Sequence, residues 1–259
     1  MNKIHKTAII GNDCKIGNNV IIGPYSIVGD NVKVGNNNII KSSVIIEGDT
    51  DISDSNTFFP FCSIGSIPQD LKFKGEKSRL IIGSNNTFRE HCTVNIGTEG
   101  DRMETIIGNS SLFMTGSHIA HDCVVGNNTI FANQATLGGH VEVDDYAVIG
   151  GISAVHQFCK IGKLAMIGGM SAVESDVIPY SLAVGNRAVV VGINIIGLKR
   201  ANFTKNEIRE YAKVVDKIFT GDSVSKEKIP FIKNKSPLVK ELIAFLDQNS
   251  SRGLCRYEK

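Results

Sequence analysis

The sequence predicts a mainly β protein: a parallel β-helix of hexapeptide repeats, followed by a small α-helical C-terminal domain. Two observations predict the β-helix. An apolar residue returns every six positions through most of the chain before residue 174, and glycine or another small residue recurs at fixed offsets from it. A third observation, helical spacing with capping residues after residue 203, predicts the helical domain.

The apolar repeat is the main basis of the fold prediction. Positions taken in steps of six are all Val, Ile, Leu or Phe from Ile10 to Ile64, from Ile82 to Val94 and, after a shift of one residue, from Ile107 to Val173. Apolar residues make up 42% of the chain, so three runs of this combined length without a polar residue at the repeat position are not chance. A six-residue unit cannot bury its apolar side chain alone, and we therefore expect the units to stack into a coil with one continuous core.

Small residues occupy two further positions of the unit. Glycine often follows the apolar anchor, where it tolerates the backbone angles of a tight corner. Four residues past the anchor the side chain is often Ser, Thr or Ala, and most of the cysteines fall in this same slot: Cys14, Cys62, Cys92, Cys123 and Cys159. We expect these five to be small buried fillers rather than disulfides, and Cys255 is left without a predicted role.

The repeat also fixes which residues lie above one another. Three hexapeptides make one coil of about 18 residues, so residue n is expected beneath residue n+18, roughly 4.8 Å away. Two polar segments interrupt the series, at about residues 66–80 and 95–106. Insertions on one side of a solenoid often build a binding surface, and we expect both segments to be loops that leave the coil.

After Val173 the repeat fades and helical signals replace it. The segment "TKNEIREYAKVVDKIF" opens with a capping box, in which Thr204 precedes Glu207 by three residues. The segment "SPLVKELIAFLDQ" has Ser236 as its cap and Pro237 at the first helical position. The predicted organisation is a β-helix over residues 1–185 and a helical domain over residues 186–259.

Charge and hydropathy exclude several classes of protein. The net charge is +2, which favours neither nucleic acid nor an anionic membrane as a partner. No stretch approaches the ~20 apolar residues of a membrane span, and the N-terminus lacks the apolar core of a signal peptide. We expect a cytoplasmic protein without stable membrane insertion. Residues 186–259 carry 15 Lys/Arg against 8 Asp/Glu, which fits either a solvated helical surface or a docking face for an acidic partner or phosphate groups.

The motif "HIAHDC", His118 to Cys123, contains the first candidate site residues. Ile119 is an anchor, so His121 and Asp122 are expected at the exposed corner after it, outside the core. Counting in 18s puts other polar residues and two glycines at the same corner, with Gly139 above His121 and His140 above Asp122. The whole predicted patch is His121, Asp122, Gly138, Gly139, His140, His156 and Gln157, with His118 on the approach.

Three interpretations of this patch remain open from the residues alone. Histidines are common zinc ligands, and some hexapeptide β-helices are zinc-dependent carbonic anhydrases, but those need three converging histidines at another spacing. The second interpretation is a general base, because imidazole titrates near neutral pH and a carboxylate can orient its ring. The third is a binding patch without chemistry on a structural solenoid.

The general-base interpretation carries a specific mechanism. Gly139 has no side chain, so its N–H could donate to a reacting carbonyl oxygen above His121. A nucleophile is missing, since Cys123 is in the buried slot and no serine occupies the corner. Direct attack by an acceptor substrate is therefore favoured over a covalent enzyme intermediate.

Six motifs, in this order, carry a resemblance to a known family: "IGPYSIVG", "SIGSIPQDLKFKGE", "HIAHDC", "GGHVEVDDYAVIGG", "AVHQFCKIG" and "NIIGLKR". Over nearly its whole length the chain resembles the UDP-N-acetylglucosamine O-acyltransferases, which begin lipid A synthesis. The resemblance implies a left-handed β-helix and transfer of a 3-hydroxyacyl chain from acyl carrier protein to the sugar 3-hydroxyl. It also implies a homotrimer with active sites between neighbouring β-helices, and no cofactor or metal beyond the carrier thioester.

Site roles follow from the resemblance position by position. His121 resembles the catalytic base, Asp122 its orienting partner and Gly139 the oxyanion donor. The residues that resemble substrate contacts are Asp70, Lys72, His118, His140, His156, Gln157, Gly169, Asn194 and Arg200. Gly169 matches the position that limits acyl length, where glycine leaves room for a longer chain.

The chain departs from the family pattern at Ile196, where an acidic residue is expected, and at Ala201, where a second arginine is expected. Both departures concern nucleotide binding. The sequence does not distinguish a 3-hydroxyl from a 3-amine on the acceptor, nor does it give the acyl length. The alternatives are the related N-acyltransferase, which would be expected to carry a further N-terminal domain, a coenzyme A-dependent acetyltransferase and a zinc-dependent β-helix lyase.

Overall fold

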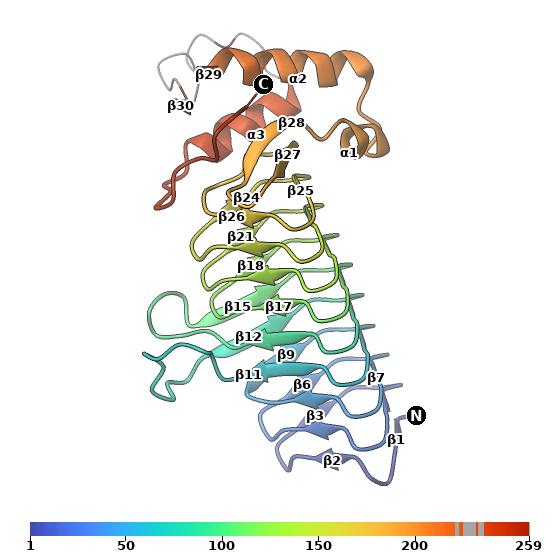
Figure 1. Cartoon of the computed structure of the whole chain (residues 1–259). Helices are drawn as coiled ribbons and strands as arrows, with labels where there is room; N and C mark the ends of the chain where they lie inside the picture. Colours follow the sequence, from blue (N-terminus) through green and yellow to red (C-terminus); the bar gives the residue numbers. More distant parts are fainter. Residues whose placement is uncertain (221–222, 225–231, 233–235, 259) are drawn as a thin grey trace.

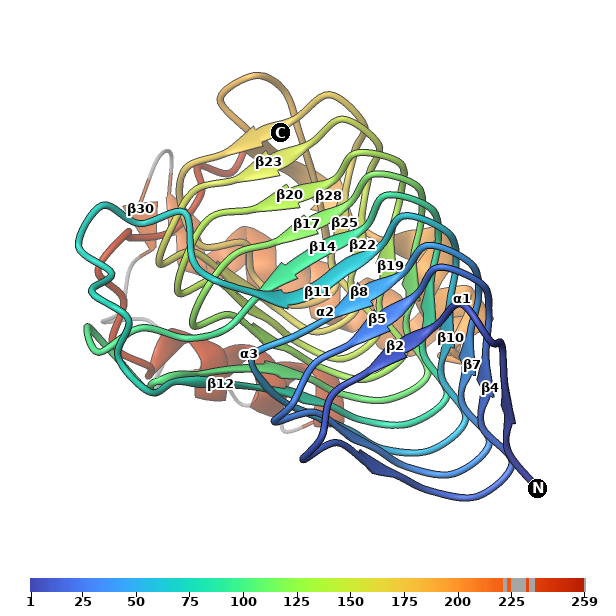
Figure 2. The same cartoon turned by 90° about the horizontal axis from the view of Figure 1, so that it is seen from below.

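A computed structural model describes residues 1–220, 223–224, 232 and 236–258. Most of the chain winds into a coil of very short strands, with the N-terminus at one end and the helices at the other (Figure 1). The strands form three sheets, one on each side of the coil (Figure 2). Adjacent strands pair in parallel, and partners such as Ile4 and Ile22 are 18 positions apart. The parallel β-helix of hexapeptide repeats predicted from the sequence is confirmed.

The strands of the coil are short because each hexapeptide contributes one strand and one corner. The first sheet, called sheet A, contains β1 (Lys3–Ile4), β4 (Ile21–Ile22), β7 (Ile39–Ile40), β10 (Thr57–Phe58), β13 (Thr87–Phe88), β16 (Leu112–Phe113), β19 (Ile130–Phe131), β22 (Val148–Ile149), β25 (Met166–Ile167), β27 (Ser181–Val184) and β28 (Val189–Ile193). Sheet B contains β2 (Ile9–Ile10), β5 (Ile27–Val28), β8 (Ile45–Ile46), β11 (Ser63–Ser66), β14 (Thr93–Asn95), β17 (His118–Ile119), β20 (Thr136–Leu137), β23 (Ala154–Val155) and β26 (Ala172–Val173). Sheet C contains β3 (Lys15–Ile16), β6 (Lys33–Val34), β9 (Asp49–Ile52), β12 (Arg79–Ile82), β15 (Glu104–Ile107), β18 (Val124–Val125), β21 (Glu142–Val143) and β24 (Lys160–Ile161).

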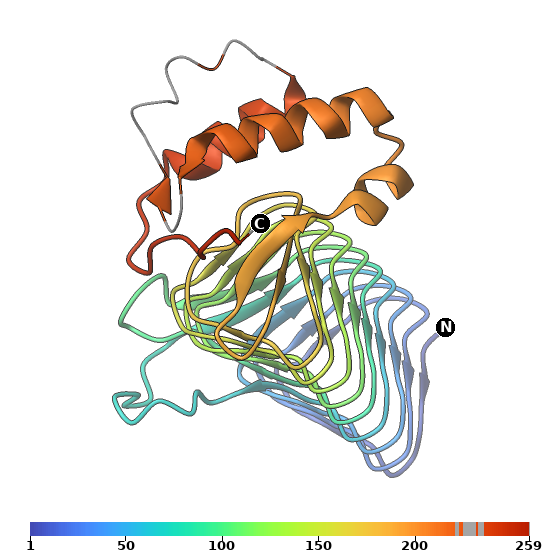
Figure 3. The same ribbon diagram turned by 45° about the horizontal axis from the view of Figure 1, so that its top comes forward.

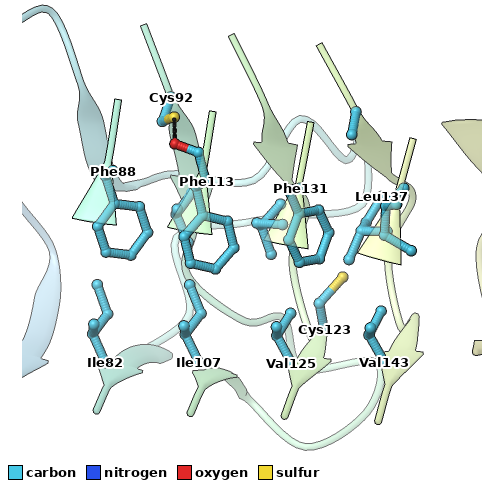
Figure 4. Packing of buried hydrophobic residues seen from close by; sticks show 14 of the residues in the cluster. Ile82, Phe88, Cys92, Ile107, Phe113, Cys123, Val125, Phe131, Leu137 and Val143 are labelled. Atoms are coloured by element: carbon cyan, nitrogen blue, oxygen red, sulfur yellow. Dashed lines mark hydrogen bonds between the residues drawn. The ribbon is translucent and has the colours of Figure 1, made fainter. Parts of the chain in front are cut away.

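The anchors form the core as columns of like side chains. Phe58, Phe88, Phe113 and Phe131 stack along sheet A, with ring centroids 4.6 to 5.0 Å apart, which is close to the spacing of neighbouring strands. Figure 4 shows three of these rings in register, facing a second column that includes Ile82. All of them are fully buried, so each coil covers the apolar side chains of the next.

The cysteines lie largely where the repeat predicts them. Cys62, Cys92, Cys123 and Cys159 are buried, and Cys14, near the open N-terminal end, is partly buried. Cys255, outside the repeat, is also buried, and its Sγ donates to the Ser175 carbonyl oxygen at 3.3 Å. None of these cysteines is paired in a disulfide.

Both predicted loops leave the coil at the corner between sheets B and C. The first loop, residues 67–78, joins β11 to β12, and the second loop, residues 96–103, joins β14 to β15. Figures 1 and 2 show them projecting on the same side. Each loop lengthens its coil, so the register grows from 18 to 30 between Ile52 and Ile82 and to 25 between Ile82 and Ile107.

The C-terminal segment covers the end of the coil. Strands β27 and β28 form an antiparallel hairpin, and the predicted boundary at residue 185 falls in its turn. The helices α1 (Ile195–Arg200), α2 (Lys205–Ile218) and α3 (Pro237–Leu246) follow, with a short hairpin of β29 (Phe219–Thr220) and β30 (Ser223–Val224) after α2. Figure 3 shows the helices lying across the end of the coil.

The start of α2 follows the sequence prediction. The Thr204 side chain accepts from the Glu207 N–H while the Glu207 carboxylate accepts from the Thr204 N–H, which is the predicted capping box. Helix α3 begins at Pro237. The buried Tyr211 of α2 donates its hydroxyl to the Pro179 carbonyl oxygen at 2.6 Å, which ties the helices to the coil. Among the described helices, none is long and apolar enough to span a membrane.

Candidate active site

The predicted patch lies at the corner between sheets B and C, next to the two loops. His121 and Asp122 form the turn after β17, and Gly139 and His140 form the turn after β20, one coil further on. A Cβ placed on Gly139 would lie 2.5 Å from Cε1 and 2.6 Å from Nε2 of His121. The His140 N–H also donates to the His121 carbonyl oxygen at 3.0 Å. Gly139 therefore stacks directly against the imidazole ring, as the count of 18 predicts.

His121 and Asp122 form a hydrogen-bonded pair. His121 Nδ1 lies 2.8 Å from Asp122 Oδ2, and the two side chains are 12% and 0% exposed. The prediction that Asp122 is exposed is wrong, although the residue does lie at the predicted corner, outside the apolar core. The second loop folds over this corner and buries the carboxylate. The hexapeptide repeat does not continue into that loop, so the burial could not be predicted by counting residues.

One residue of the second loop and one residue of β15 hold Asp122. The Thr98 N–H lies 3.1 Å from each carboxylate oxygen, and the Thr98 hydroxyl donates to Oδ2 at 2.6 Å. The Asp122 N–H donates to the Thr105 hydroxyl oxygen at 2.9 Å. This last bond stabilises a left-handed backbone, since φ of Asp122 is +57°.

These contacts determine the charge of the pair. Burial opposes ionisation of Asp122, but the hydrogen bonds from His121 and Thr98 outweigh it and hold the pKa of the carboxyl below its usual value. Asp122 is therefore an anion at neutral pH. A carboxylate can only accept, so the proton of a neutral His121 ring is on Nδ1 and Nε2 is free to take another.

His140 lies across the ring of His121. The two rings meet at 90° with centroids 5.0 Å apart, and His140 stacks on Phe158 at 4.3 Å. His140 Nδ1 is also 3.0 Å from the Asp101 carboxylate of the second loop. The sequence analysis did not name Phe158 as a site residue, although adding 18 to His140 gives this position. Asp101 lies in a loop outside the repeat, so no count could have identified it.

His118 is the predicted neighbour on the approach to the corner. It lies on β17, and its Nδ1 is 2.7 Å from the Thr93 hydroxyl. Burial, and then the nearby His121, lower the pKa of His118, so its ring is neutral at neutral pH. A neutral ring beside His121 does not compete with it for positive charge.

A cavity of about 470 Å³ opens beside His140, between the two loops. Its lining includes Asp70 and Lys72 of the first loop, Thr98 of the second, and His140 and Phe158 of the corner. The Lys72 N–H donates to Asp70 Oδ1 at 2.9 Å, which orders this part of the first loop. The structure thus brings Asp70, Lys72 and His140 together at one cavity, and their contact with substrate stays a prediction.

Other predicted site residues lie outside this cavity. His156 and Gln157 are exposed one coil beyond His140 at the same corner. Gly169 lies at the corner between sheets A and B, and Arg200 ends α1. Asn194 caps α1, since its Oδ1 accepts from the Gly197 N–H at 2.9 Å. Within the described part of one chain, Gly169, Asn194 and Arg200 are not brought to the His121 corner.

The same corner holds three side chains of types that can bind a metal ion. Ligand atoms of His121, Asp122 and His140 lie within 4.8 Å of one another. However, Asp122 Oδ2 already accepts from the Thr98 hydroxyl and lies 2.8 Å from His121 Nδ1. A metal here would have to displace both contacts, so the donor set fits a hydrogen-bonded pair better than a metal centre.

The fold and the site together define a class of protein. A coil of hexapeptide repeats is the feature that places this chain among the hexapeptide-repeat transferases. A sequence model described as bacterial transferase hexapeptide repeats matches residues 13–48 and 104–139. A second, described as domain 2 of UDP-N-acetylglucosamine O-acyltransferase, matches residues 176–255.

Whole-length relatives narrow this class. The chain is 54% identical to the acyl-[acyl-carrier-protein]–UDP-N-acetylglucosamine O-acyltransferase of Rickettsia peacockii, over 99% of this chain and 98% of the relative. It is 53% identical to the protein of that name from Rickettsia bellii, over 99% of this chain and 92% of the relative. The chain belongs to this family and is an acyltransferase.

Solved structures agree. LpxA from Acinetobacter baumannii is 43% identical and superposes with a TM-score of 0.93, covering 98% of this chain and 99% of that one. The UDP-N-acetylglucosamine acyltransferase of Francisella novicida is 34% identical with a TM-score of 0.93, covering 98% of this chain and 94% of that one. The likeness extends over the coil and the helical end together.

Proposed function

We propose that this acyltransferase moves a 3-hydroxyacyl chain from acyl carrier protein to the 3-hydroxyl of UDP-N-acetylglucosamine, as the first step of lipid A synthesis. The names of its relatives support the two substrates. The observation that supports the chemistry is the His121–Asp122 pair stacked against Gly139, with the cavity of the two loops beside it. The carrier thioester is the co-substrate, and no cofactor has a role in the proposed reaction.

The proposed mechanism uses His121 as the general base. Its Nε2 takes the proton of the sugar 3-hydroxyl while the sugar oxygen forms a bond to the thioester carbonyl carbon. The Gly139 N–H, which no acceptor among the described residues takes, donates to the carbonyl oxygen as negative charge develops there. The carbon–sulfur bond then breaks, and the His121 imidazolium returns the proton to the leaving thiolate.

No covalent enzyme intermediate is proposed. Cys123 is the nearest thiol in sequence, but its side chain points into the core and burial raises its pKa to about 12. A thiol with so high a pKa is almost entirely protonated at neutral pH and is a poor nucleophile. Direct attack by the sugar hydroxyl requires no enzyme nucleophile.

The test is a steady-state assay with UDP-N-acetylglucosamine and 3-hydroxyacyl carrier proteins of several chain lengths, comparing wild type with His121→Ala. We expect turnover to fall by roughly 10²–10⁴, the scale for loss of a general base. His5→Ala, at an exposed position in the first coil, is the matched control. Near-wild-type turnover by His121→Ala would rule out the proposed base. An acceptor with a 3-amine in the same assay distinguishes O-acyl from N-acyl transfer.

We also propose that the protein is a homotrimer. Sheets A and B expose isoleucines at the outward position of successive strands, including Ile9, Ile27 and Ile45 at 37–62%, whereas sheet C has Lys15 and Lys33 at that position. The corner between sheets A and B adds Met170, 74% exposed and next to Gly169. An apolar surface of this extent favours association. Light scattering should give three times the 28.0 kDa chain mass, and a monomer would contradict the proposal.

A trimer would also account for the scattered site residues. Gly169, Asn194 and Arg200 lie away from the His121 corner in one chain, and a neighbouring coil could bring its own copies there. The basic tail, with 15 Lys/Arg in residues 186–259, is the proposed docking face for the acidic carrier protein.

A further inference from the structure

The second loop contacts Asp122, the partner of the proposed base, with buried groups. Thr98, at the start of the loop, directs both its N–H and its hydroxyl to the Asp122 carboxylate. Thr98 is 4% exposed and Asp122 is fully buried. Water therefore has little access to this carboxylate, and the hydrogen bonds of the protein must replace it.

The position of Thr98 is fixed from both sides. On one side, the Ser78 hydroxyl donates to the Gly97 carbonyl oxygen at 2.5 Å, and the Glu99 N–H donates to the Glu76 carboxylate at 3.1 Å. On the other, Asp101 lies 3.0 Å from the His140 ring. The first two contacts hold the second loop to the first loop and the third holds it to the coil, so Thr98 presents its two donors in one fixed geometry.

An ionised Asp122 is what makes His121 a base at Nε2. A buried carboxylate without enough donors takes up a proton, and a protonated Asp122 can no longer hold the His121 proton on Nδ1. His121 supplies one donor to this carboxylate, and Thr98 supplies two. Thr98 therefore contributes most of the hydrogen bonds that keep Asp122 charged.

We propose that Thr98 is a positioning residue for the reaction: its hydroxyl holds the Asp122 carboxylate ionised and oriented, and through it the His121 ring. This inference rests on the proposed role of His121 as base. Thr98 also lines the cavity, but its hydroxyl is committed to Asp122 and does not need to contact substrate.

The proposal predicts a change in pH dependence. The titratable groups that face Asp122 are His121 and, at 3.9 Å, His140, which in turn faces Asp101. Without the Thr98 hydroxyl, the anion is less stabilised and the coupled His121–Asp122 pair takes up a proton more readily. The acid limb of the pH–rate profile should move to higher pH by about one unit, the scale for one hydrogen bond to a charged group.

The experiment compares Thr98→Val, Thr98→Ser and the matched control Thr129→Val. Thr129 is fully buried at a different corner, and its hydroxyl donates to Ser111 Oγ at 2.8 Å. For Thr98→Val we expect kcat at pH 6.5 to fall about 10-fold, KM to stay within about threefold and the acid limb to shift upward. Thr98→Ser should restore both kcat and the limb, and Thr129→Val should leave both unchanged.

The outcomes separate this inference from the proposed function. If His121→Ala is inactive while Thr98→Val keeps the wild-type kcat and pH profile, the positioning role is wrong and the base stands. If His121→Ala is active, the base itself is wrong. Thr98→Val added to His121→Ala should lower turnover no further, because both act through one pair, and an additional 10-fold loss would overturn the proposal. Melting temperatures of all variants show whether a loss comes from unfolding instead.

Discussion

Substitution of Gly139 by alanine tests the stacking of Gly139 on the base. The added Cβ would lie 2.5 Å from Cε1 and 2.6 Å from Nε2 of His121. Ordinary contacts of a Cβ begin at about 3.4 Å, so the ring must move by about 1 Å. The ring cannot move alone, because Asp122, 2.8 Å from its Nδ1, is fully buried and fixed by Thr98.

The expected size of the effect follows from this displacement. A misplacement of about 1 Å of a catalytic group costs roughly 100-fold in rate. The displaced ring would also lie further from the Gly139 N–H, the proposed oxyanion donor. We expect kcat of Gly139→Ala to fall about 100-fold at all pH values, since the charges of His121 and Asp122 are unchanged. The assay measures steady-state acyl transfer from about pH 5.5 to about pH 9, with both substrates at saturating concentrations.

The control is Gly29→Ala, at the same corner of an N-terminal coil. There the new Cβ would meet its nearest atom, the Glu47 Cα, at 3.4 Å, which is an ordinary contact. Wild-type kcat in Gly139→Ala, with the variant folded as shown by its melting temperature, would refute the stacked arrangement of ring and oxyanion donor. A loss seen equally in Gly29→Ala would assign the effect to the coil.

Four further predictions concern other parts of the site. Asp122→Asn should lower kcat by roughly 10²–10⁴. Because the pKa of Asp122 is depressed, its stabilising contribution is present at neutral pH and lost as pH falls below about 4, so the variant should show a weaker loss of melting temperature in acid than wild type. Gly169→Met should shorten the preferred acyl chain without unfolding the protomer, since a Cβ there lies 3.4 Å from its nearest neighbour, and an unchanged chain-length profile would argue against a role in acyl selection. Alkylating agents should leave native turnover intact because Cys123 is buried with a pKa of about 12, and inactivation that tracks its labelling would contradict this. Affinity for acyl carrier protein should weaken as salt rises from about 50 to about 500 mM, because salt screens attraction between exposed charges. Salt-independent affinity would exclude the basic tail as its docking face.

The coil could be predicted from sequence because its energetics repeat. Each anchor must be apolar because it is buried between neighbouring coils. The pattern averaged over many units therefore identifies the fold even where single units are ambiguous. The count of 18 failed at the loops, where the partner of Ile52 is Ile82, and at the end of the coil, where the partner of Met166 is Leu182. Cys255 shows the same limit at the C-terminus: it is buried against Ser175, but no repeat extends into the tail that packs there.

The site was predictable to the extent that it is part of the coil. Gly139 over His121 and His140 near Asp122 follow from counting, and so would Phe158. The burial of Asp122 does not follow, because it depends on how residues 96–103 fold back, and loop conformation has no period. The contacts of Thr98 and Asp101 arise from the same loop and carry no motif that sequence reasoning could have used.

Coil and loop therefore make separable contributions to the proposed base. The coil fixes where His121 lies. The His140 N–H donates to the His121 carbonyl oxygen, and Gly139, which has no Cβ, leaves the space that the ring occupies. A bare corner of the coil faces water, where a carboxylate orients an imidazole weakly. The second loop supplies the burial and the donors that make Asp122 effective. Changes to the coil contact, such as Gly139→Ala, should lower kcat equally at every pH, whereas changes to the loop contact, such as Thr98→Val, should lower it most at acidic pH. Identical pH profiles for these two variants would refute this separation.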